Sequence, residues 1–297
     1  MYDVWLGSEQ SAQNYVARIQ ALLGQYGTIE MAVHEASVKL DANTDYEDED
    51  HNGYRWCNSV GYELVDGVAI VTVSGGTETT TSNWTRMLGI PTYQDIRYRM
   101  QQAYADTGAR VILLNLDTEG GMAKGAFGMS EYISAYDKQV KPVATFTGGI
   151  MASAGVLYGT AARVVIADQY ADVGSIGAIA VFLDLSGALK QAGVKAYVFR
   201  SAPYKGKPNA YEGMDDKGKE VLQAYIDEKH GQFVNVLSAN LGMPAADINK
   251  NIANGKMFGA QEALSLGLIQ SIATYEKTLA SLNQRYQNTP TSTARAV

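Results

Sequence analysis

Cysteine and proline are both scarce in this chain, with 1 Cys and 6 Pro among 297 residues. The single Cys57 cannot form an internal disulfide, so nothing indicates an oxidising compartment, and we interpret it as a small hydrophobic residue. Few prolines, together with 46% hydrophobic and 19% charged residues, exclude a disordered chain. The sequence is therefore expected to fold around a sizeable core.

Clusters of basic residues and long apolar runs are missing as well. The formal net charge is −7, which argues against a nucleic-acid partner. No apolar stretch is long enough to span a bilayer, and residues 1–7 lack the basic start and apolar core of a signal peptide. We therefore expect a protein that acts in the cytosol without a membrane partner, and we expect no cofactor.

Composition divides the chain into four parts. Residues 1–40 carry apolar side chains at helical spacing and predict an N-terminal helical segment. An acidic linker covers 41–52; as a calcium loop it would lack the turn glycine and the closing glutamate. An α/β domain is expected over 53–275, and a polar tail over 276–297.

Strand and helix patterns alternate through the predicted domain. A hairpin is expected between Tyr62 and Val73, with Asp66-Gly67 as its turn. The alternation that follows predicts a parallel sheet with right-handed βαβ units. A long helix over 215–241 and short helices near Asp247 and Gln261 complete the domain. The expected alternating elements are helix 91–106, strand 110–116, helix 122–137, strand 142–147, helix 153–162 and strand 164–167.

Two of the predicted strand ends carry residues suited to chemistry, because reactive groups gather beyond the carboxyl ends of strands in α/β sheets. Gly120-Gly121 follows the first strand end and lets backbone N–H groups face an oxyanion, although the glycines alone favour a plain tight turn. Ser153 follows the second, between Ala152 and Ala154, as a nucleophile does at a sharp strand-to-helix turn. A helix N-cap is the alternative for this serine.

A catalytic serine needs a base, and histidine is the usual one. The chain has three histidines, His34, His51 and His230, and none follows a predicted strand end. We interpret each as a surface or packing residue. A lysine can replace histidine when it is desolvated enough to be neutral near pH 7.

Five short segments occur in order along the predicted domain. They are Asp117-Thr-Glu-Gly-Gly-Met122, Ala152-Ser-Ala-Gly155, Val173-Gly-Ser-Ile-Gly-Ala178, Arg200-Ser-Ala-Pro-Tyr-Lys205 and Gly255 to Ile269. Together they resemble the signal-peptide-peptidase-A family of serine proteases. The resemblance covers about residues 61–272, and the spacing between Ser153 and Lys205 agrees with that family. It implies the ClpP/crotonase fold and a serine–lysine dyad.

The resemblance implies a role for each residue of the site. Ser153 would be the nucleophile and Lys205 the general base, with Ser175 orienting the lysine amine. Gly120 would donate its N–H to the oxyanion together with the N–H of Ser153, and Gly121 would shape that turn.

Two positions depart from the family pattern, and one lysine competes for the role of base. Glu119 stands where the family has proline, and Ala154 where it has glycine; both concern the shape of the loops. Lys207 is also close in sequence, so Lys205 is favoured by its spacing and by the preceding Tyr204.

Residues 117–127 resemble in particular the head-maturation proteases of tailed phages. This branch implies scaffold, portal or capsid proteins as substrates, self-cleavage, and a ring-like homo-oligomer that works in the host cytoplasm or the procapsid interior. Three other functions stay open: a cytosolic bacterial peptidase of the same family, a crotonase-type acyl-CoA enzyme, which would not need Lys205, and a catalytically silent assembly factor.

Overall fold

A computed structural model describes residues 5–7, 61–82, 85 and 89–289. The expected acidic linker, Cys57, His34 and His51 lie outside these ranges. Of the expected N-terminal helical segment, the described part is strand β1 (Trp5–Gly7), which is extended and not helical.

The body of the described structure is built on a six-stranded sheet with the order β11-β8-β6-β4-β3-β2. All neighbours run parallel except the edge hairpin of β2 and β3, so the predicted hairpin and parallel sheet are both confirmed. The hairpin turns at Asp66 and Gly67, which both have positive φ. The strands are β2 (Glu63–Val65), β3 (Val68–Ser74), β4 (Val111–Asp117), β6 (Val143–Thr147), β8 (Val164–Ala167) and β11 (Ser271–Ile272).

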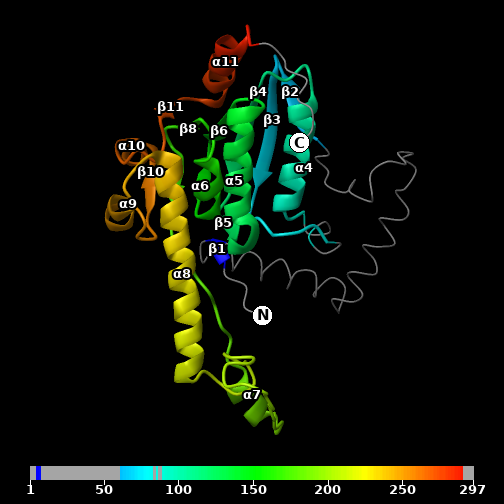
Figure 1. The fold of residues 1–297 in the computed structure, drawn as a ribbon, viewed down its shortest axis with the longest axis vertical. Helices are drawn as coiled ribbons and strands as arrows, with labels where there is room; N and C mark the ends of the chain where they lie inside the picture. The colour runs from blue at the N-terminus through cyan, green and yellow to red at the C-terminus, as the bar shows by residue number, and fades with distance from the viewer. Residues whose placement is uncertain (1–4, 8–60, 83–84, 86–88, 290–297) are drawn as a thin grey trace, which may run out of the picture.

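Both faces of this sheet are buried, which explains why its strands read as continuous apolar runs. On one face, alternate residues such as Val71 and Leu114 pack against helices α4 (Tyr93–Ala105), α5 (Ala123–Gln139) and α6 (Ala154–Gly159). Figure 1 shows these helices lined up in front of the strands.

The opposite face of the sheet is covered by α11 (Tyr275–Tyr286). Its Leu282 and Tyr286 pack against Val68, Leu113 and Phe146 of the strands. The prediction of a polar tail over 276–297 is therefore wrong up to Tyr286. The helix has enough apolar side chains on one side to bury that side, although its other side is polar.

Beyond their carboxyl ends, three of the main strands lead into short strands. β4 leads into β5 (Gly120–Met122), β6 into β7 (Ile150–Ala152), and β8 into β9 (Asp172–Gly174). β7 pairs with β9, and β9 with β10 (Met257–Gly259), in a small second sheet. β5 pairs with β1. The residues predicted to be functional at the strand ends lie in this layer.

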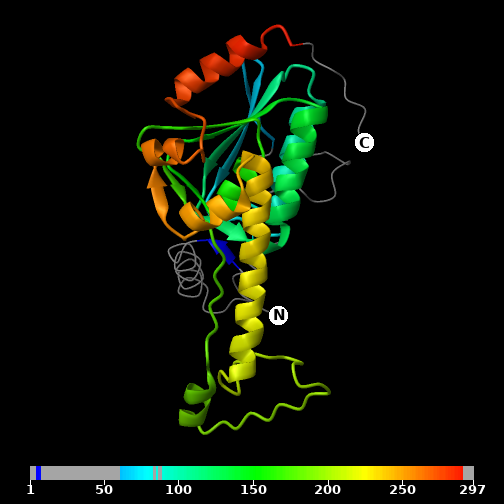
Figure 2. The same ribbon diagram turned by 60° about the vertical axis from the view of Figure 1, so that its left-hand side comes forward.

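The long helix α8 (Asp216–Leu241) extends from the body. Its N-terminal part, together with α7 (Ser186–Gln191) and the segments on either side of α7, is called the arm. Both ribbon views show α7, and the segment that joins it to α8, at the far end of α8 from the sheet (Figures 1 and 2). α8 returns the chain to the body, where α9 (Ala245–Asn251) and α10 (Ala260–Ser265) follow. Within the described ranges, no helix combines the length and the apolar composition needed to cross a membrane.

Candidate active site

Ser153 lies at a sharp junction between strand and helix. β7 ends at Ala152, α6 begins at Ala154, and Ser153 between them has φ 51° and ψ −114°. A residue other than glycine in this region costs about 1–3 kcal/mol, and such strain gathers at functional sites. The Ser153 side chain makes no capping hydrogen bond, so the N-cap alternative does not describe it. Its Oγ lies 3.5 Å from the carbonyl oxygen of Gly177.

The loop that follows β9 is held directly against Ser153. The Ser153 N–H donates to the Gly174 carbonyl at 2.7 Å. Gly174 has φ 151°, and a Cβ there would lie 2.3 Å from the carbonyl oxygen of Lys256, so only glycine fits. Ser175 also has a positive φ of 52°, and its N–H donates to the same Lys256 carbonyl at 2.7 Å. The structure thus holds the Ser175 loop against the serine.

Thr118, which sequence reasoning missed, connects the glycine strand to the serine junction. Its N–H donates to the Ile150 carbonyl at 2.7 Å, and its own carbonyl accepts from the Ala152 N–H at 2.9 Å. Its Oγ1 accepts from the Gly120 N–H at 3.1 Å. A Cβ on Gly155 would lie 2.6 Å from Thr118 Cγ2, so this glycine lets the first turn of α6 approach. The available signal was a polar residue directly after an apolar strand.

The two glycines of β5 differ in the direction of their backbone groups. The Gly120 carbonyl accepts from the Thr77 N–H at 2.8 Å, and the Met122 N–H donates to the Thr77 carbonyl at 2.9 Å. Because successive residues of a strand point to opposite sides, the N–H of Gly121 faces the outer edge. A Cβ on Gly121 would lie 2.2 Å from the Thr77 carbonyl oxygen, so the strands touch only because this residue is glycine.

The two N–H groups expected at the oxyanion have other hydrogen-bond partners in this structure. The N–H groups of Gly120 and Ser153 are both engaged, with Thr118 Oγ1 and the Gly174 carbonyl respectively. The sequence identified the glycine pair but not its register. Of the N–H groups of Gly120 and Gly121, only that of Gly121 faces away from Thr77.

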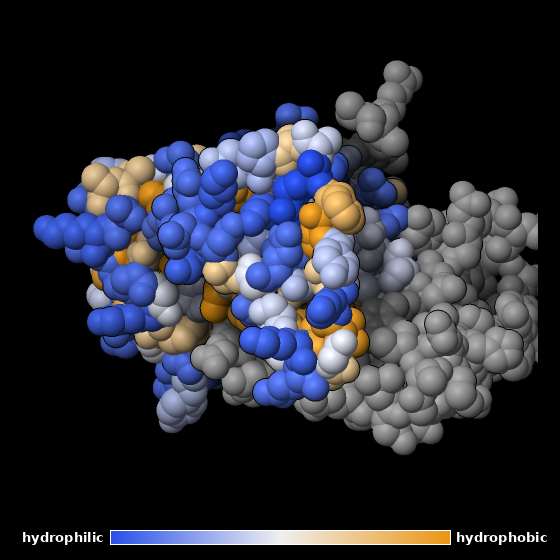
Figure 3. All heavy atoms as spheres, turned by 90° about the horizontal axis from the view of Figure 1, so that it is seen from below, coloured by the Kyte–Doolittle hydropathy of each residue, from blue (hydrophilic) through white to orange (hydrophobic). Residues whose placement is uncertain are grey.

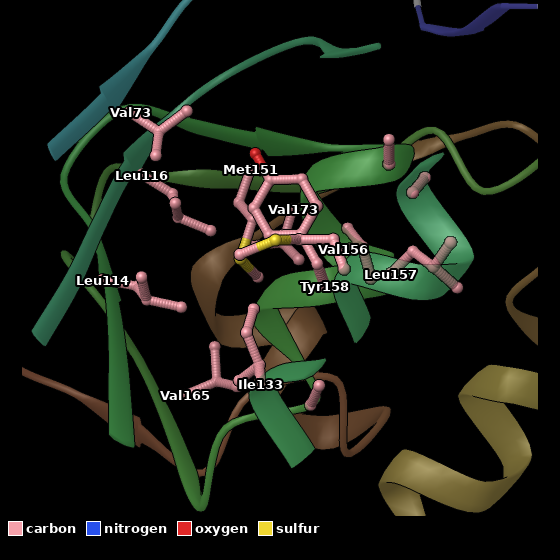
Figure 4. Packing of buried hydrophobic residues seen from close by; sticks show 14 of the residues in the cluster. Val73, Leu114, Leu116, Ile133, Met151, Val156, Leu157, Tyr158, Val165 and Val173 are labelled. Atoms are coloured by element: carbon pink, nitrogen blue, oxygen red, sulfur yellow. The ribbon is translucent and has the colours of Figure 1, made fainter. Parts of the chain in front are cut away.

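Two buried tyrosines, Tyr93 of α4 and Tyr158 of α6, lie next to each other near β5, and Tyr93 bonds to it directly. The Tyr93 hydroxyl donates to the Met122 carbonyl at 3.0 Å, and its ring meets Tyr158 edge to face, with centroids 6.1 Å apart. Figure 4 shows the Tyr158 ring packed among Met151, Val156 and Val173. Burial raises the pKa of Tyr158 to about 12 and raises the pKa of Tyr93 well above its usual value. Both hydroxyls therefore keep their protons at neutral pH.

Lys205 lies on the arm and not beside Ser153. Its side chain is exposed; its N–H donates to the Ala202 carbonyl at 3.0 Å, and its carbonyl accepts from Arg200 Nε at 3.0 Å. Among the residues that the structure describes, Lys205 has no ion-pair partner, whereas Lys207 pairs with Asp215. Within a single chain, Ser153 lies at the start of α6 in the body, whereas the segment between α7 and α8, which carries Lys205, lies at the far end of α8 (Figure 1).

The remaining candidates from the sequence lie away from the serine. His230 on α8 shares a hydrogen bond of 3.0 Å with Asn249 of α9, which agrees with a packing role. In the described ranges, His, Cys, Asp and Glu side chains form no group of three that could hold a metal ion.

A strained serine at a strand-to-helix turn, beside a glycine strand at the carboxyl ends of a parallel sheet, is an arrangement used by serine hydrolases. Residues 135–288, more than half of the chain, match the model of peptidase family S49. The chain belongs to this family, as the sequence motifs predicted.

Two curated relatives come from phages. The chain is 31% identical over 223 residues to "Capsid assembly protease C" of Escherichia phage lambda, covering 75% of this chain and 50% of that protein. It is 27% identical over 255 residues to "Head-tail preconnector protein GP5" of Enterobacteria phage P21, covering 85% and 50%. The chain therefore spans about half the length of these relatives.

Among solved structures, an enoyl-CoA hydratase/isomerase family member is similar over 76% of this chain and 75% of its own, with a TM-score of 0.46 and 18% identity.

Proposed function

We propose that the chain is a serine endopeptidase in which Ser153 is the nucleophile and Lys205 the general base. The observation that carries the proposal is the conformation of Ser153, which is strained, buried and free of a capping role. Family membership supports the reaction class, and the spacing of Lys205 supports the choice of base.

In this mechanism the neutral Lys205 amine accepts the Oγ proton while Oγ attacks the scissile carbonyl carbon. The carbonyl oxygen becomes negative and is stabilised by the Gly121 N–H and by the Ala154 N–H, which has no intrahelical acceptor because it begins α6. The lysine then gives its proton to the leaving amine. Water, deprotonated by the same lysine, releases the acyl group and restores Ser153.

The dyad is completed between two copies of the chain in this proposal, because one copy keeps its own Lys205 on the arm. The arm has many exposed hydrophobic side chains, and Phe199 is 93% exposed. Exposed apolar surface of this extent indicates an interface. Figure 3 views the molecule from the arm end and shows orange hydrophobic residues among blue hydrophilic ones. The exposed residues are Val181, Leu183, Val194, Tyr197, Phe199, Tyr204 and Tyr211.

A second copy is the partner that explains both features, because it would cover this apolar surface and desolvate Lys205. Contacts between different patches of identical subunits form rings when the rotation from one subunit to the next closes. We propose a ring-like homo-oligomer in which the arm of each subunit brings Lys205 to the Ser153 of its neighbour. Ser175, in the loop beside Ser153, is proposed to hydrogen-bond the arriving amine.

Substrates are proposed from the names of the relatives. The lambda and P21 proteins are named for capsid assembly and for the head-tail connection. We propose that this chain cleaves scaffold, portal or capsid proteins, and itself, while a phage head is assembled in the host cytoplasm.

Complementation tests the dyad between copies. Ser153→Ala and Lys205→Ala should each be inactive alone on a purified capsid or scaffold protein, read by intact-mass analysis. Mixed in equal amounts and allowed to exchange subunits, they should recover about a quarter of the sites, because half of the subunits supply each residue.

The double variant Ser153→Ala/Lys205→Ala is the matched control for mixing. It brings neither functional residue, so it should restore nothing to either single variant. If the mixture of Ser153→Ala and Lys205→Ala recovers no activity while the wild type is active, each site uses residues of one chain only.

A further inference from the structure

The outer edge of β5 is occupied by the chain's own N-terminal strand. β1 pairs antiparallel with β5, with Trp5 opposite Met122, Leu6 opposite Gly121 and Gly7 opposite Gly120. Figure 1 shows β1 directly below β5, at the end of the body from which the arm leaves. The pairing joins residues that are more than a hundred positions apart in the sequence.

The register determines which backbone groups meet across this edge. Gly120 O and Met122 N are already bonded to Thr77 on the inner side. The N–H and carbonyl of Gly121 face outward, so Leu6 is the residue of β1 that exchanges hydrogen bonds with it. The Leu6 carbonyl therefore lies at the N–H group that the proposed mechanism assigns to the oxyanion.

An extended peptide is the partner that fits such an edge. Strand addition uses main-chain hydrogen bonds for affinity, so peptides of different sequence can take the same place. The two glycines of β5 present no side chain that would obstruct a backbone at this edge. β1 shows the geometry directly, because it is a peptide of this kind seated on the edge.

We propose that residues Trp5–Gly7 occupy the substrate-binding edge and compete with peptide substrates for it. This inference rests on the proposed function, since it treats Gly121 as part of the site. The competition is intramolecular, and a tethered segment acts at an effective concentration in the millimolar range. Substrate must therefore displace β1 before its scissile carbonyl can reach the Gly121 N–H.

The register supplies a matched pair of variants in the full chain. Leu6→Pro removes the N–H that faces β5, so β1 should leave the edge. Gly7→Pro removes an N–H that points away from β5 and should leave the pairing in place. Both variants are made in a Ser153→Ala background, so that peptide binding is measured without cleavage.

The probe is a fluorescein-labelled peptide of residues 1–10 of this chain, and its affinity is measured by anisotropy. Leu6→Pro should bind the peptide at least about tenfold more tightly than the Ser153→Ala parent, because the tethered competitor is gone. Gly7→Pro should bind it as the parent does. Equal affinity in all three proteins would overturn the proposal.

Amide exchange gives a second measurement that does not depend on peptide binding. The Gly121 amide should be protected in the parent and in Gly7→Pro, and should exchange at least about tenfold faster in Leu6→Pro. An unprotected Gly121 amide in the parent would also overturn the proposal.

The same variants separate this inference from the proposed function. With Ser153 restored, Leu6→Pro should cleave the unlabelled peptide faster than the wild type. If Leu6→Pro binds the peptide more tightly but no protein with Ser153 cleaves any substrate, the edge is a peptide-binding site and the protease assignment fails.

Discussion

The hydroxyl of Tyr93 donates to the carbonyl of Met122 at 3.0 Å, across a fully buried contact between α4 and β5. This bond holds the strand that carries Gly121 on the side opposite to the edge that β1 occupies. A Cβ on Gly125 would lie 2.7 Å from the Tyr93 ring, so the chain after β5 is shaped to admit this side chain.

Tyr93→Phe should therefore leave the Met122 carbonyl buried without a donor, which costs about 1–3 kcal/mol of unfolding free energy. Cleavage should fall as well, because β5 loses one of its supports. Denaturant unfolding and a peptide-cleavage assay read the two effects. Tyr170→Phe is the control, since Tyr170 is 85% exposed and its loss of a hydroxyl should change stability by less than about 0.5 kcal/mol.

Ser153→Gly should be more stable than Ser153→Ala by about 1 kcal/mol or more, although both are inactive. Glycine adopts the φ of 51° without strain, whereas alanine keeps the strain of serine. Denaturant midpoints with equal slopes measure the difference. Equal stability of the two variants would show that the turn stores no strain.

Lys205→Arg should be as inactive as Lys205→Ala, because arginine keeps the charge but cannot give up its proton. Lys207→Arg is the matched control: it preserves the ion pair with Asp215 and should keep most of the activity. Activity in Lys205→Arg would show that Lys205 contributes its charge and does not act as the general base.

Gly121→Ala should abolish cleavage and destabilise the fold by about 1–3 kcal/mol, because its Cβ would lie 2.2 Å from the Thr77 carbonyl oxygen. Gly187→Ala, on α7, meets nothing within 4 Å and should be tolerated. Thermal unfolding and active-site labelling of both variants make the comparison. A stable and active Gly121→Ala would contradict the close approach of β5 to Thr77.

Acid should loosen the arm. The hydrogen bond from Arg200 lowers the pKa of Glu212, the hydrogen bond from Lys207 lowers the pKa of Asp215, and the Ser186 hydroxyl lowers the pKa of Asp184. A carboxyl whose folded pKa is lowered stabilises the fold above its ordinary pKa and loses that contribution as the pH falls through the lowered value.

The contribution of these three carboxyls should therefore be complete above their ordinary pKa values of about 4, and should be lost progressively as the pH falls through their lowered pKa values. Amide exchange in residues 186–215, measured from pH 6 downward with correction for the intrinsic rate, should show lost protection in the arm before the body. Glu212→Gln should weaken the arm already at pH 6. An arm whose protection is independent of pH would refute the role of these pairs.

The order of strands and helices could be predicted because the pattern is local. The run from Val111 to Leu116 is apolar except at Asn115, since both faces of the sheet are covered. The Asp66-Gly67 turn sets the hairpin of β2 and β3. The tail was misassigned because α11 buries only a few side chains, and a narrow apolar stripe reads as polar on average.

For the candidate site, the sequence predicted the positions of residues in motifs but not the directions of their backbone groups. Ser153 and the glycine pair lie at strand ends that periodicity can locate. The roles of Gly120 and Gly121 depend on which way each N–H points, and that is set by pairing with Thr77, a contact distant in the sequence. Tyr93 and Thr118 act through contacts between elements, which no local pattern encodes.

Helix α8 makes the tip of the arm mechanically sensitive to events in the body. Its 26 residues, at about 1.5 Å each, form a lever of about 39 Å. The lever is anchored at one end, where Phe233 and Leu237 enter the core. A tilt of about 5° at this anchor would displace the tip by about 3 Å, roughly the length of one hydrogen bond. Packing changes beneath Phe233 are thus amplified at the segment that carries Lys205.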